Sequence, residues 1–361
     1  MTVRVAPVNR PVVEVEITDM AFGGKGVARH EGKVLFVPFV IPGEMVRARI
    51  VRDRRKFAEA ELLEVLRPSP HRVEPRCPYF GRCGGCAYQH IAYAEQLAIK
   101  QRQVEQTLRR LGHLENVPIR PIIASPSDYG YRNRIRVHVD GHCAGFYAHA
   151  SHNLIDIEEC PIAAPEVNAA LADLRHTPVP DGDYIVSGRG RGEFFEQTNN
   201  VVAAELTRVV RECVRDGRQL LIDAFSGAGF FARNLVDKAE RVVGIEENIF
   251  AVEHARRRAG ERERYLAGDV ALHLGEVLAS AEASRTSVVL DPPSAGIAPR
   301  VSDLLLARPA GQIIYVSCDP GTLARDLGVL CRTSYRLESV TPLDMFPQTA
   351  EVEVVAHLEA N

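Results

Sequence analysis

The chain has 361 residues, of which 46% are hydrophobic, so at ~100–200 residues per domain it can bury large cores in two or three domains. This composition excludes a disordered or collagen-like protein. The longest apolar stretches, such as residues 34–41, fall far short of the ~18 residues that cross a membrane. The first residues lack the apolar segment of a secretory signal, so we expect a cytoplasmic protein.

Charge is divided unevenly along the chain, although the net charge is only −3. Residues 1–136 contain 23 Lys and Arg against 14 Asp and Glu, whereas residues 137–361 contain 21 against 33. A basic front indicates contact with a polyanion, although a solvated surface can show the same asymmetry. The eight cysteines, in a chain without an export signal, favour metal binding or catalysis over disulfides.

Residues 12–66 alternate between apolar and polar positions in short runs separated by glycine turns. This spacing predicts a small β-barrel for residues 1–68. Basic residues gather on its later strands, where they could follow a phosphate backbone or form an ordinary solvated face. These residues are Arg47, Arg49, Arg52, Arg54, Arg55 and Lys56.

Residues 69–200 are predicted to form a small mixed α/β domain, which a linker over residues 68–75 joins to the barrel. A helix is expected over residues 92–111, with an apolar stripe of Leu97, Val104, Leu108 and Leu111. A strand is expected to follow over residues 131–139.

Three cysteines of this middle region, Cys77, Cys83 and Cys86, have the spacing C-x5-C-x2-C. Cys160 is the best candidate for a fourth ligand, because it precedes a proline as Cys77 does. Four thiolates beside prolines are typical of an iron–sulfur cluster, whereas structural zinc more often uses two C-x2-C pairs or mixed Cys and His ligands. We predict a 4Fe–4S cluster, with zinc or unliganded thiols as alternatives.

Beyond residue 201, predicted strands alternate with helices, with strands over residues 219–225, 241–247, 263–269, 287–293 and 312–318. This alternation is typical of a doubly wound parallel sheet. The chain is therefore predicted to be an α/β protein whose residues 201–361 form a Rossmann-like domain.

Acidic residues stand at four successive strand ends of this domain, at intervals of 22 or 23 residues. Because parallel strands end at one edge of the sheet, their side chains should line the ligand cleft there. Any one of them alone could instead be a helix cap. The residues are Asp223, Glu246, Asp269 and Asp291.

A glycine turn with Gly227 and Gly229 follows the first of these strands and matches G-x-G-x-x-A, which also occurs in dinucleotide-binding proteins. So much negative charge beside a pyrophosphate would not suit a dehydrogenase, whereas it suits the cationic S-adenosylmethionine. We expect Glu246 to bind the ribose, Asp269 to lie near the adenine, and Asp223 and Asp291 to lie nearer the amino-acid end.

The next strand end carries Cys318, in the sequence S-C-D-P. A thiolate there can add to C6 of a pyrimidine and make C5 nucleophilic enough to accept a methyl group, although Cys318 could also be a core residue. Glu351 and Glu353 are expected on one face of a later strand, where one of them could remove the C5 proton.

Taken with these residues, the chain resembles the S-adenosylmethionine-dependent RNA 5-methyluridine methyltransferases, nearly end to end, in the branch with a TRAM domain and an iron–sulfur domain. The resemblance implies an oligonucleotide-binding-type TRAM barrel at the front and four cluster ligands. It also implies Cys318 as the nucleophile and Glu353 as the proton acceptor. The further cofactor-binding residues that it implies are Gln197 in the F-x-Q-x-N segment that begins at Phe195, Phe225, Glu246 and Asp291.

Three features depart from the family pattern. The family usually has Arg at the position of Ser294 and His at the position of Glu351, and the span from Cys160 to Gln197 is shorter than is common. These departures concern target handling and leave the thiol, the donor site and the base in place.

We therefore predict a methyltransferase that makes 5-methyluridine in structured RNA, with 23S ribosomal RNA favoured over tRNA and no obligate protein partner. The barrel and the strand with Arg132, Arg134 and Arg136 are expected to grip the RNA while the uridine leaves its stack. One alternative is an RNA 5-methylcytosine transferase, which would place a cysteine where Ser294 stands. The other is a non-catalytic RNA-binding protein that retains the fold.

Overall fold

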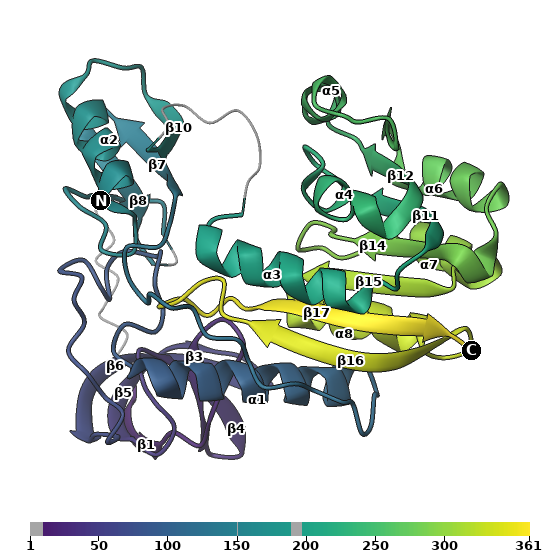
Figure 1. The fold of residues 1–361 in the computed structure, drawn as a ribbon. Coiled ribbons are helices and arrows are strands. Elements are labelled where there is room, and N and C mark those ends of the chain that lie inside the picture. The colour runs from purple at the N-terminus through teal and green to yellow at the C-terminus, as the bar shows by residue number, and fades with distance from the viewer. Residues whose placement is uncertain (1–9, 150, 189–196) are drawn as a thin grey trace, which may run out of the picture.

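The computed structural model describes residues 10–149, 151–188 and 197–361, which form three β-sheets. Residues 1–9 of the predicted barrel domain and Phe195 lie outside this description. Figure 1 shows the three sheets in separate parts of the molecule, with the C-terminal sheet as the largest. Within the described residues, no helix is long and apolar enough to span a membrane.

The N-terminal sheet has six strands in the order β1-β5-β6-β4-β3-β2. Strands β1 and β2 stand at its two edges but are almost continuous in the chain, so the sheet curves back on itself as the predicted barrel requires. Alternate side chains such as Leu35, Val37, Val46 and Ala48 are fully buried in its core. The strands are β1 (Val12–Glu16), β2 (Asp19–Met20), β3 (Lys25–His30), β4 (Lys33–Pro38), β5 (Met45–Asp53) and β6 (Phe57–Arg67).

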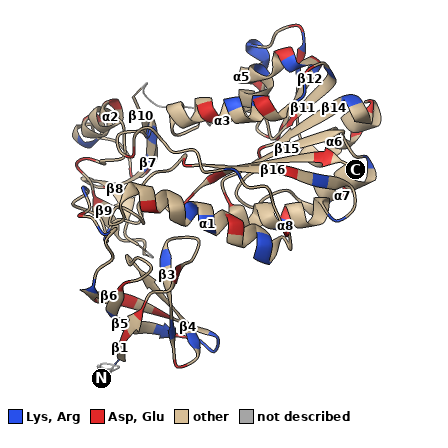
Figure 2. Ribbon diagram, turned by 60° about the horizontal axis from the view of Figure 1, so that its bottom comes forward, with Lys and Arg blue, Asp and Glu red and all other residues tan. Residues whose placement is uncertain are grey.

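Acidic partners neutralise much of the basic face on these strands, as the interleaved blue and red segments in Figure 2 indicate. Arg47 pairs with Glu14 and Glu64, and Arg49 pairs with Glu61. Such cross-strand pairs hold an antiparallel sheet together and leave little charge for a polyanion. In the described part of the chain, the residues of this face without an ion pair stand at the tip of the β5–β6 hairpin, namely Arg54, Arg55 and Lys56.

The middle sheet has four antiparallel strands in the order β10-β7-β8-β9. Val167 and Leu171 of helix α2 pack against its inner face, where Ile135 and Val137 are buried. The elements are β7 (Arg134–Asp140), β8 (Cys143–Tyr147), β9 (Leu154–Asp156), α2 (Pro165–His176) and β10 (Gly182–Ser187).

Helix α1 (Tyr93–Leu111) lies where the apolar stripe predicts it, but it does not pack on the middle sheet. Its Val104 and Leu108 are buried in a core of the C-terminal domain, and Figure 2 shows it beside α8. The two sides of the predicted boundary at residue 200 are therefore tightly joined, and a separate domain over residues 69–200 remains a prediction.

The C-terminal sheet has seven strands in the order β13-β12-β11-β14-β15-β17-β16, which confirms the doubly wound arrangement. Strands β11 to β15 are parallel, and β17 runs antiparallel between β15 and β16. The order reverses between β11 and β14, the place where open α/β sheets bind ligands. The strands are β11 (Arg218–Ala224), β12 (Ala239–Glu246), β13 (Glu263–Ala267), β14 (Thr286–Leu290), β15 (Gln312–Ser317), β16 (Tyr335–Leu343) and β17 (Glu353–Ala360).

Helices cover both faces of this sheet and form two apolar cores. Helices α1, α6, α7 and α8 pack on one face, and α3, α4 and α5 pack on the other. Their bounds are α3 (Asn200–Cys213), α4 (Phe230–Asn234), α5 (Ile249–Arg257), α6 (Val270–Ala279), α7 (Pro299–Ala307) and α8 (Pro320–Leu330).

Candidate active site

Three predicted site residues meet at one edge of the C-terminal sheet. Cys318 directly follows β15, and Asp291 directly follows the neighbouring β14. Ser317 pairs with Val354 across β15 and β17, so the next position of the register sets Cys318 opposite Glu353. The edge therefore brings a thiol and two carboxyl groups together.

Burial alters the charge of all three groups. It raises the pKa of Cys318 to about 12, with a further contribution from the nearby Glu353 and Asp291. It raises the pKa of Asp291 to about 7, and burial together with Asp291 raises the pKa of Glu353 well above its usual range. Burial and neighbouring carboxyl groups cause these shifts, so a cation bound there would favour ionisation of the thiol and the carboxyl groups.

Glu351 does not share this position, although the sequence predicted it on the same strand face as Glu353. Strand β17 begins only at Glu353, which is 4% exposed, and Glu351 lies exposed in the preceding loop. That prediction is wrong, because an irregular buried loop imitates the alternation of a strand in the sequence.

The glycine turn after β11 has the open backbone that a ligand needs. Phe225 and Gly227 both have left-handed backbone angles, with φ of 65° and 51°. Such an angle is costly for a residue other than glycine and often occurs at ligand sites. Apart from Gly227 itself and its two chain neighbours, no described residue has an atom within 4 Å of the position where a side chain on Gly227 would begin, so the turn leaves room beside its backbone.

Glu246 and Asp269 stand at the strand ends as predicted, and both engage the backbone. The carboxylate of Glu246 accepts hydrogen bonds from the N–H groups of Gly227 and Asn248 at 3.0 and 2.8 Å. The exposed Asp269 caps α6 by accepting one from the N–H of Leu272 at 2.8 Å. Glu246 is thus fixed beside the glycine turn. Asp269 caps a helix, which is the alternative role that the sequence left open for each of the four acidic residues.

Asp223 is fully buried behind the same turn. Its Oδ2 accepts a hydrogen bond from the N–H of Ala232 at 2.8 Å, and its Oδ1 has no hydrogen-bond partner among the described residues. Burial raises its pKa to about 8, and the neighbouring Asp291 and Glu246 add to this shift. An unpartnered buried carboxyl oxygen fits a positively charged ligand group at this edge.

Gln197 lies immediately before α3 and is 9% exposed. Its backbone carbonyl accepts a hydrogen bond from the side chain of Asn133 at 2.8 Å. Asn199, two residues later, caps α3 and donates to the Ser125 hydroxyl at 3.1 Å. Contact between Gln197 and a cofactor remains a prediction.

The loop over residues 344–352, which leads to Glu353, is held by α1, and the sequence did not reveal this. Gln96 and Gln348 form a reciprocal pair, in which the Gln348 N–H donates to Gln96 Oε1 at 3.1 Å and Gln96 Nε2 donates to Gln348 Oε1 at 3.0 Å. Lys100 also reaches this loop and bonds to the Phe346 carbonyl at 3.0 Å. The sequence contained one indication of this contact, namely the basic residue Lys100 on the apolar face of the helix.

All four predicted cluster ligands, Cys77, Cys83, Cys86 and Cys160, line one pocket of about 50 Å³. Burial raises the pKa of Cys86 to about 12 and that of Cys160 to about 11. No group of three or more His, Cys, Asp or Glu side chains in the described ranges is placed to hold a metal ion. The structure therefore gathers the thiols without arranging them as ligands.

Two parts of the chain match known protein families. Residues 9–63 match the TRAM domain, and residues 274–361 match the family described as tRNA (Uracil-5-)-methyltransferase. The second match includes the edge with Asp291, Cys318 and Glu353.

Relatives that match nearly the whole chain are named RNA methyltransferases. An uncharacterized RNA methyltransferase of Bdellovibrio bacteriovorus is 33% identical over 99% of this chain and 97% of its own length. One from Gloeobacter violaceus is 31% identical over 96% of each chain. The crystal structure of the Pyrococcus abyssi tRNA (uracil-54, C5)-methyltransferase with S-adenosyl-L-homocysteine superposes with a TM-score of 0.69 and 25% identity, over 96% of this chain and 100% of that one. The chain belongs to the S-adenosylmethionine-dependent RNA (uracil-5-)-methyltransferase family that carries a TRAM domain.

Proposed function

We propose that this enzyme methylates C5 of a uridine in structured RNA through a covalent bond between Cys318 and C6. The supporting observation is the register that sets Cys318 opposite Glu353, with Asp291 beside them. The nucleophile and the base would then flank one pyrimidine ring, as the reaction requires.

The proposed reaction uses the two groups in turn. The Cys318 thiolate forms an S–C6 bond, and the electron pair of the C5–C6 double bond becomes available at C5. When bound, S-adenosylmethionine would supply an electrophilic methyl group, which would form a bond to C5 as its bond to sulfur breaks, so that the donor would leave as the neutral thioether S-adenosylhomocysteine. The Glu353 carboxylate then takes the C5 proton, the S–C6 bond breaks, the double bond reforms, and Cys318 leaves as a thiolate. Cys318 and Glu353 lose their protons more easily when a positive charge lies beside them, so cofactor binding would activate both.

We assign the cofactor site to the edge formed by the glycine turn and the strand-end acids. Its open backbone, the fixed Glu246 carboxylate and the orphan Asp223 oxygen support this assignment. Glu246 would accept hydrogen bonds from the ribose hydroxyls, and Asp291 would face the positive end of the ligand. The remaining proposed contacts are Gln197, Phe225, Gly227 and Asp269.

We further propose that Cys77, Cys83, Cys86 and Cys160 hold a 4Fe–4S cluster that orders the RNA-contacting region. Their shared pocket supports this assignment. Buried neutral thiols with raised pKa values need metal to become thiolates.

Anaerobic purification tests the cluster assignment. A brown protein with absorbance near ~400 nm and equal iron and sulfide is expected. The Cys160→Ser variant should lose this absorbance, and Cys143→Ser, an exposed cysteine on β8 outside the pocket, should keep it. A colourless protein with bound zinc would overturn the assignment.

We propose 23S ribosomal RNA as the substrate, because a TRAM domain combined with four candidate cluster cysteines resembles the ribosomal RNA members of the family, and we propose that the enzyme acts in the cytoplasm. Transfer RNA is the second candidate, because the Pyrococcus abyssi neighbour acts on tRNA. A 5-methylcytosine reaction is less well supported, because Ser294 stands where a catalytic cysteine would be expected.

Nucleoside analysis of a deletion strain tests both the reaction and the substrate. Loss of 5-methyluridine from the ribosomal fraction, and its return with the wild-type gene but not with Cys318→Ala, is the expected result. Loss confined to the transfer fraction would assign the substrate to tRNA, and unchanged 5-methyluridine in both fractions would refute the proposed function.

A further inference from the structure

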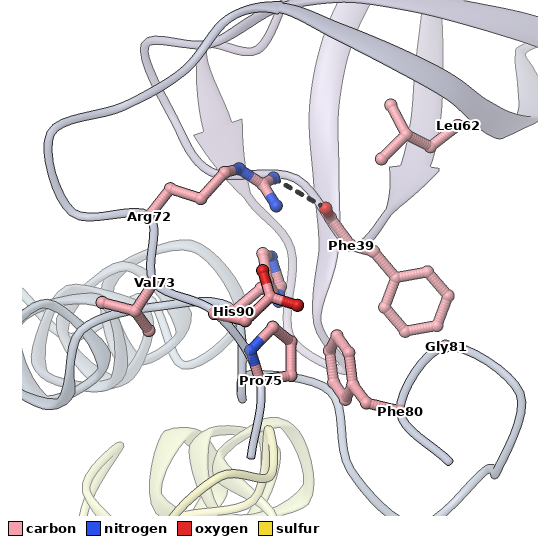
Figure 3. A pocket seen from close by; sticks show the side chains of 9 residues that line it. Phe39, Leu62, Arg72, Val73, Pro75, Phe80, Gly81 and His90 are labelled. Carbon is pink, nitrogen blue, oxygen red and sulfur yellow. Dashed lines mark hydrogen bonds between the residues drawn. The ribbon is translucent and has the colours of Figure 1, made fainter. Parts of the chain in front are cut away.

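A groove of about 430 Å³ lies where the barrel meets the cysteine-bearing loop. Phe39 and Leu62 line it from the barrel, Pro75 from the linker, and Phe80 from the loop between Cys77 and Cys83. Figure 3 shows the rings of Phe39 and Phe80 side by side at its wall. The proposed methyl transfer uses none of these residues.

The walls of the groove contain the partly exposed rings of Phe39 and Phe80, which the buried ring of His90 supports from behind. The rings of Phe39 and Phe80 meet edge to face, with centroids 5.2 Å apart and planes at 72°. The ring of His90 lies 5.5 Å from that of Phe80 at 33°. Rings in this arrangement can stack with another planar group.

A buried hydrogen-bond network holds this wall rigid. Phe39 has a left-handed φ of 62°, and its carbonyl accepts a hydrogen bond from Arg72 at 2.9 Å. Arg72 in turn bonds to both carboxylate oxygens of Glu44, at 2.6 and 2.8 Å, and Glu44 is fully buried. A costly backbone angle fixed in this way indicates a preorganised binding surface.

Positive charge flanks the apolar wall. Arg76 follows Pro75, and Arg82 follows Gly81; both side chains are exposed and neither forms an ion pair with any described residue. Their guanidinium groups lie instead over the rings of Tyr129 and Tyr79. These two arginines do not line the groove, whose charged lining residues are Glu74 and the Arg72 that pairs with Glu44, so recognition of a planar base would depend on the aromatic rings.

We propose that this groove binds one unpaired base of the substrate RNA, which stacks on Phe39 and Phe80. The inference rests on the proposed RNA substrate and adds a contact outside the site of methyl transfer. Phe80 also lines the cysteine pocket, so the metal-site loop and the base-binding groove share one wall.

Two RNAs of equal length test this proposal with the anaerobically prepared full-length protein. One is a single-stranded 20-mer of mixed sequence, and the other is its abasic analogue, which keeps the phosphates but lacks the bases. Fluorescence anisotropy gives Kd for each, and the ratio of the two reports base recognition alone. Phe80→Ala is expected to reduce the preference for the base-containing RNA by about tenfold, and Phe80→Tyr is expected to retain it.

Matched variants separate stacking from folding. Phe57→Ala removes another partly exposed ring, on β6 and outside the groove, and should leave the ratio unchanged. Phe80→Leu keeps apolar volume but removes the ring, so it should lose the preference even if Phe80→Ala proves unstable. A wild-type ratio in Phe80→Leu, or an equal loss of affinity for both RNAs, would overturn the proposal.

The measurement involves no methyl transfer, so it stands apart from the test of the proposed function. A protein that prefers the base-containing RNA through Phe80 but leaves cellular 5-methyluridine unchanged would contradict only the proposed function. A protein that methylates uridine but shows no dependence on Phe80 would contradict only the groove assignment.

Discussion

Lys100 and Asp344 form an ion pair of 2.6 Å between two completely buried side chains that are 244 residues apart in the chain. Lys100 belongs to α1, and Asp344 begins the loop that leads to Glu353. The pair therefore fastens the loop over residues 344–352 to a helix from the preceding region, and Lys100 is a candidate positioning residue for the proposed base Glu353.

Lys100→Met should destabilise the protein strongly, because it leaves the Asp344 carboxylate buried without its cation. We expect the free energy of unfolding to fall by about 3–5 kcal/mol, measured by urea denaturation. Lys33→Met, which breaks an exposed pair with Asp53, should cost less than about 1 kcal/mol. A similar small loss for both variants would show that the buried pair has no special role.

Cys318→Ala should abolish methyl transfer by at least about 10³-fold, because no other group there can add to C6. The variant should also fail to form a denaturant-stable complex with RNA that contains 5-fluorouridine, which traps the adduct because its C5 carries no removable proton. Cys331→Ala, a half-buried cysteine at the end of α8, is the matched control and should trap RNA normally. Trapping by Cys318→Ala would exclude this thiol as the nucleophile.

Glu353→Gln should slow release of the methylated base by about 10²–10⁴-fold while leaving adduct formation possible. A labelled methyl group should then accumulate on RNA bound covalently to the protein, detectable on a denaturing gel. Glu351→Gln changes an exposed carboxylate two residues away and should turn over at nearly the wild-type rate. If the two variants behaved alike, Glu353 would not be the base.

Asp223 should make the unliganded protein less stable as pH rises. Burial raises its folded-state pKa to about 8 from an ordinary value near ~3.9, so the folded state binds the extra proton. This contribution to stability is complete below about pH 4 and is lost as pH rises through 8. Asp223→Asn should therefore show a smaller fall in Tm between pH 5 and 8 than the wild type, whereas exposed Asp303→Asn should follow the wild type.

The sequence predicted the parts of the site that depend on local repetition. Asp223, Glu246, Asp269, Asp291 and Cys318 stand at or just after the ends of regularly spaced parallel strands, so one periodic pattern places them at a common edge. The loop over residues 344–352 is different, because its buried path depends on hydrogen bonds between Gln348 and Gln96, which is 252 residues away in the chain.

Contacts between residues far apart in the chain also explain the other differences between the sequence-based predictions and the structure. Arg47 reads as a free cation in the sequence, yet it pairs with Glu14 because β1 lies beside β5 in the barrel. Helix α1 has the predicted apolar stripe, but no periodicity tells which of two cores that stripe enters. Patterns of residues specify elements, whereas the pairing of distant elements depends on tertiary packing.

The antiparallel strand β17, which lies between β15 and β16, carries Glu353 within the sheet and away from the barrel. Because Cys318 directly follows β15 and Glu353 begins the adjacent β17, the backbone hydrogen bonds between these two strands set the separation of the two proposed reacting groups. The barrel and the middle sheet can therefore change their shape to suit another RNA while the reacting groups keep their distance. An engineer who exchanged those outer parts between relatives would alter which nucleotide is delivered and preserve the catalyst that receives it.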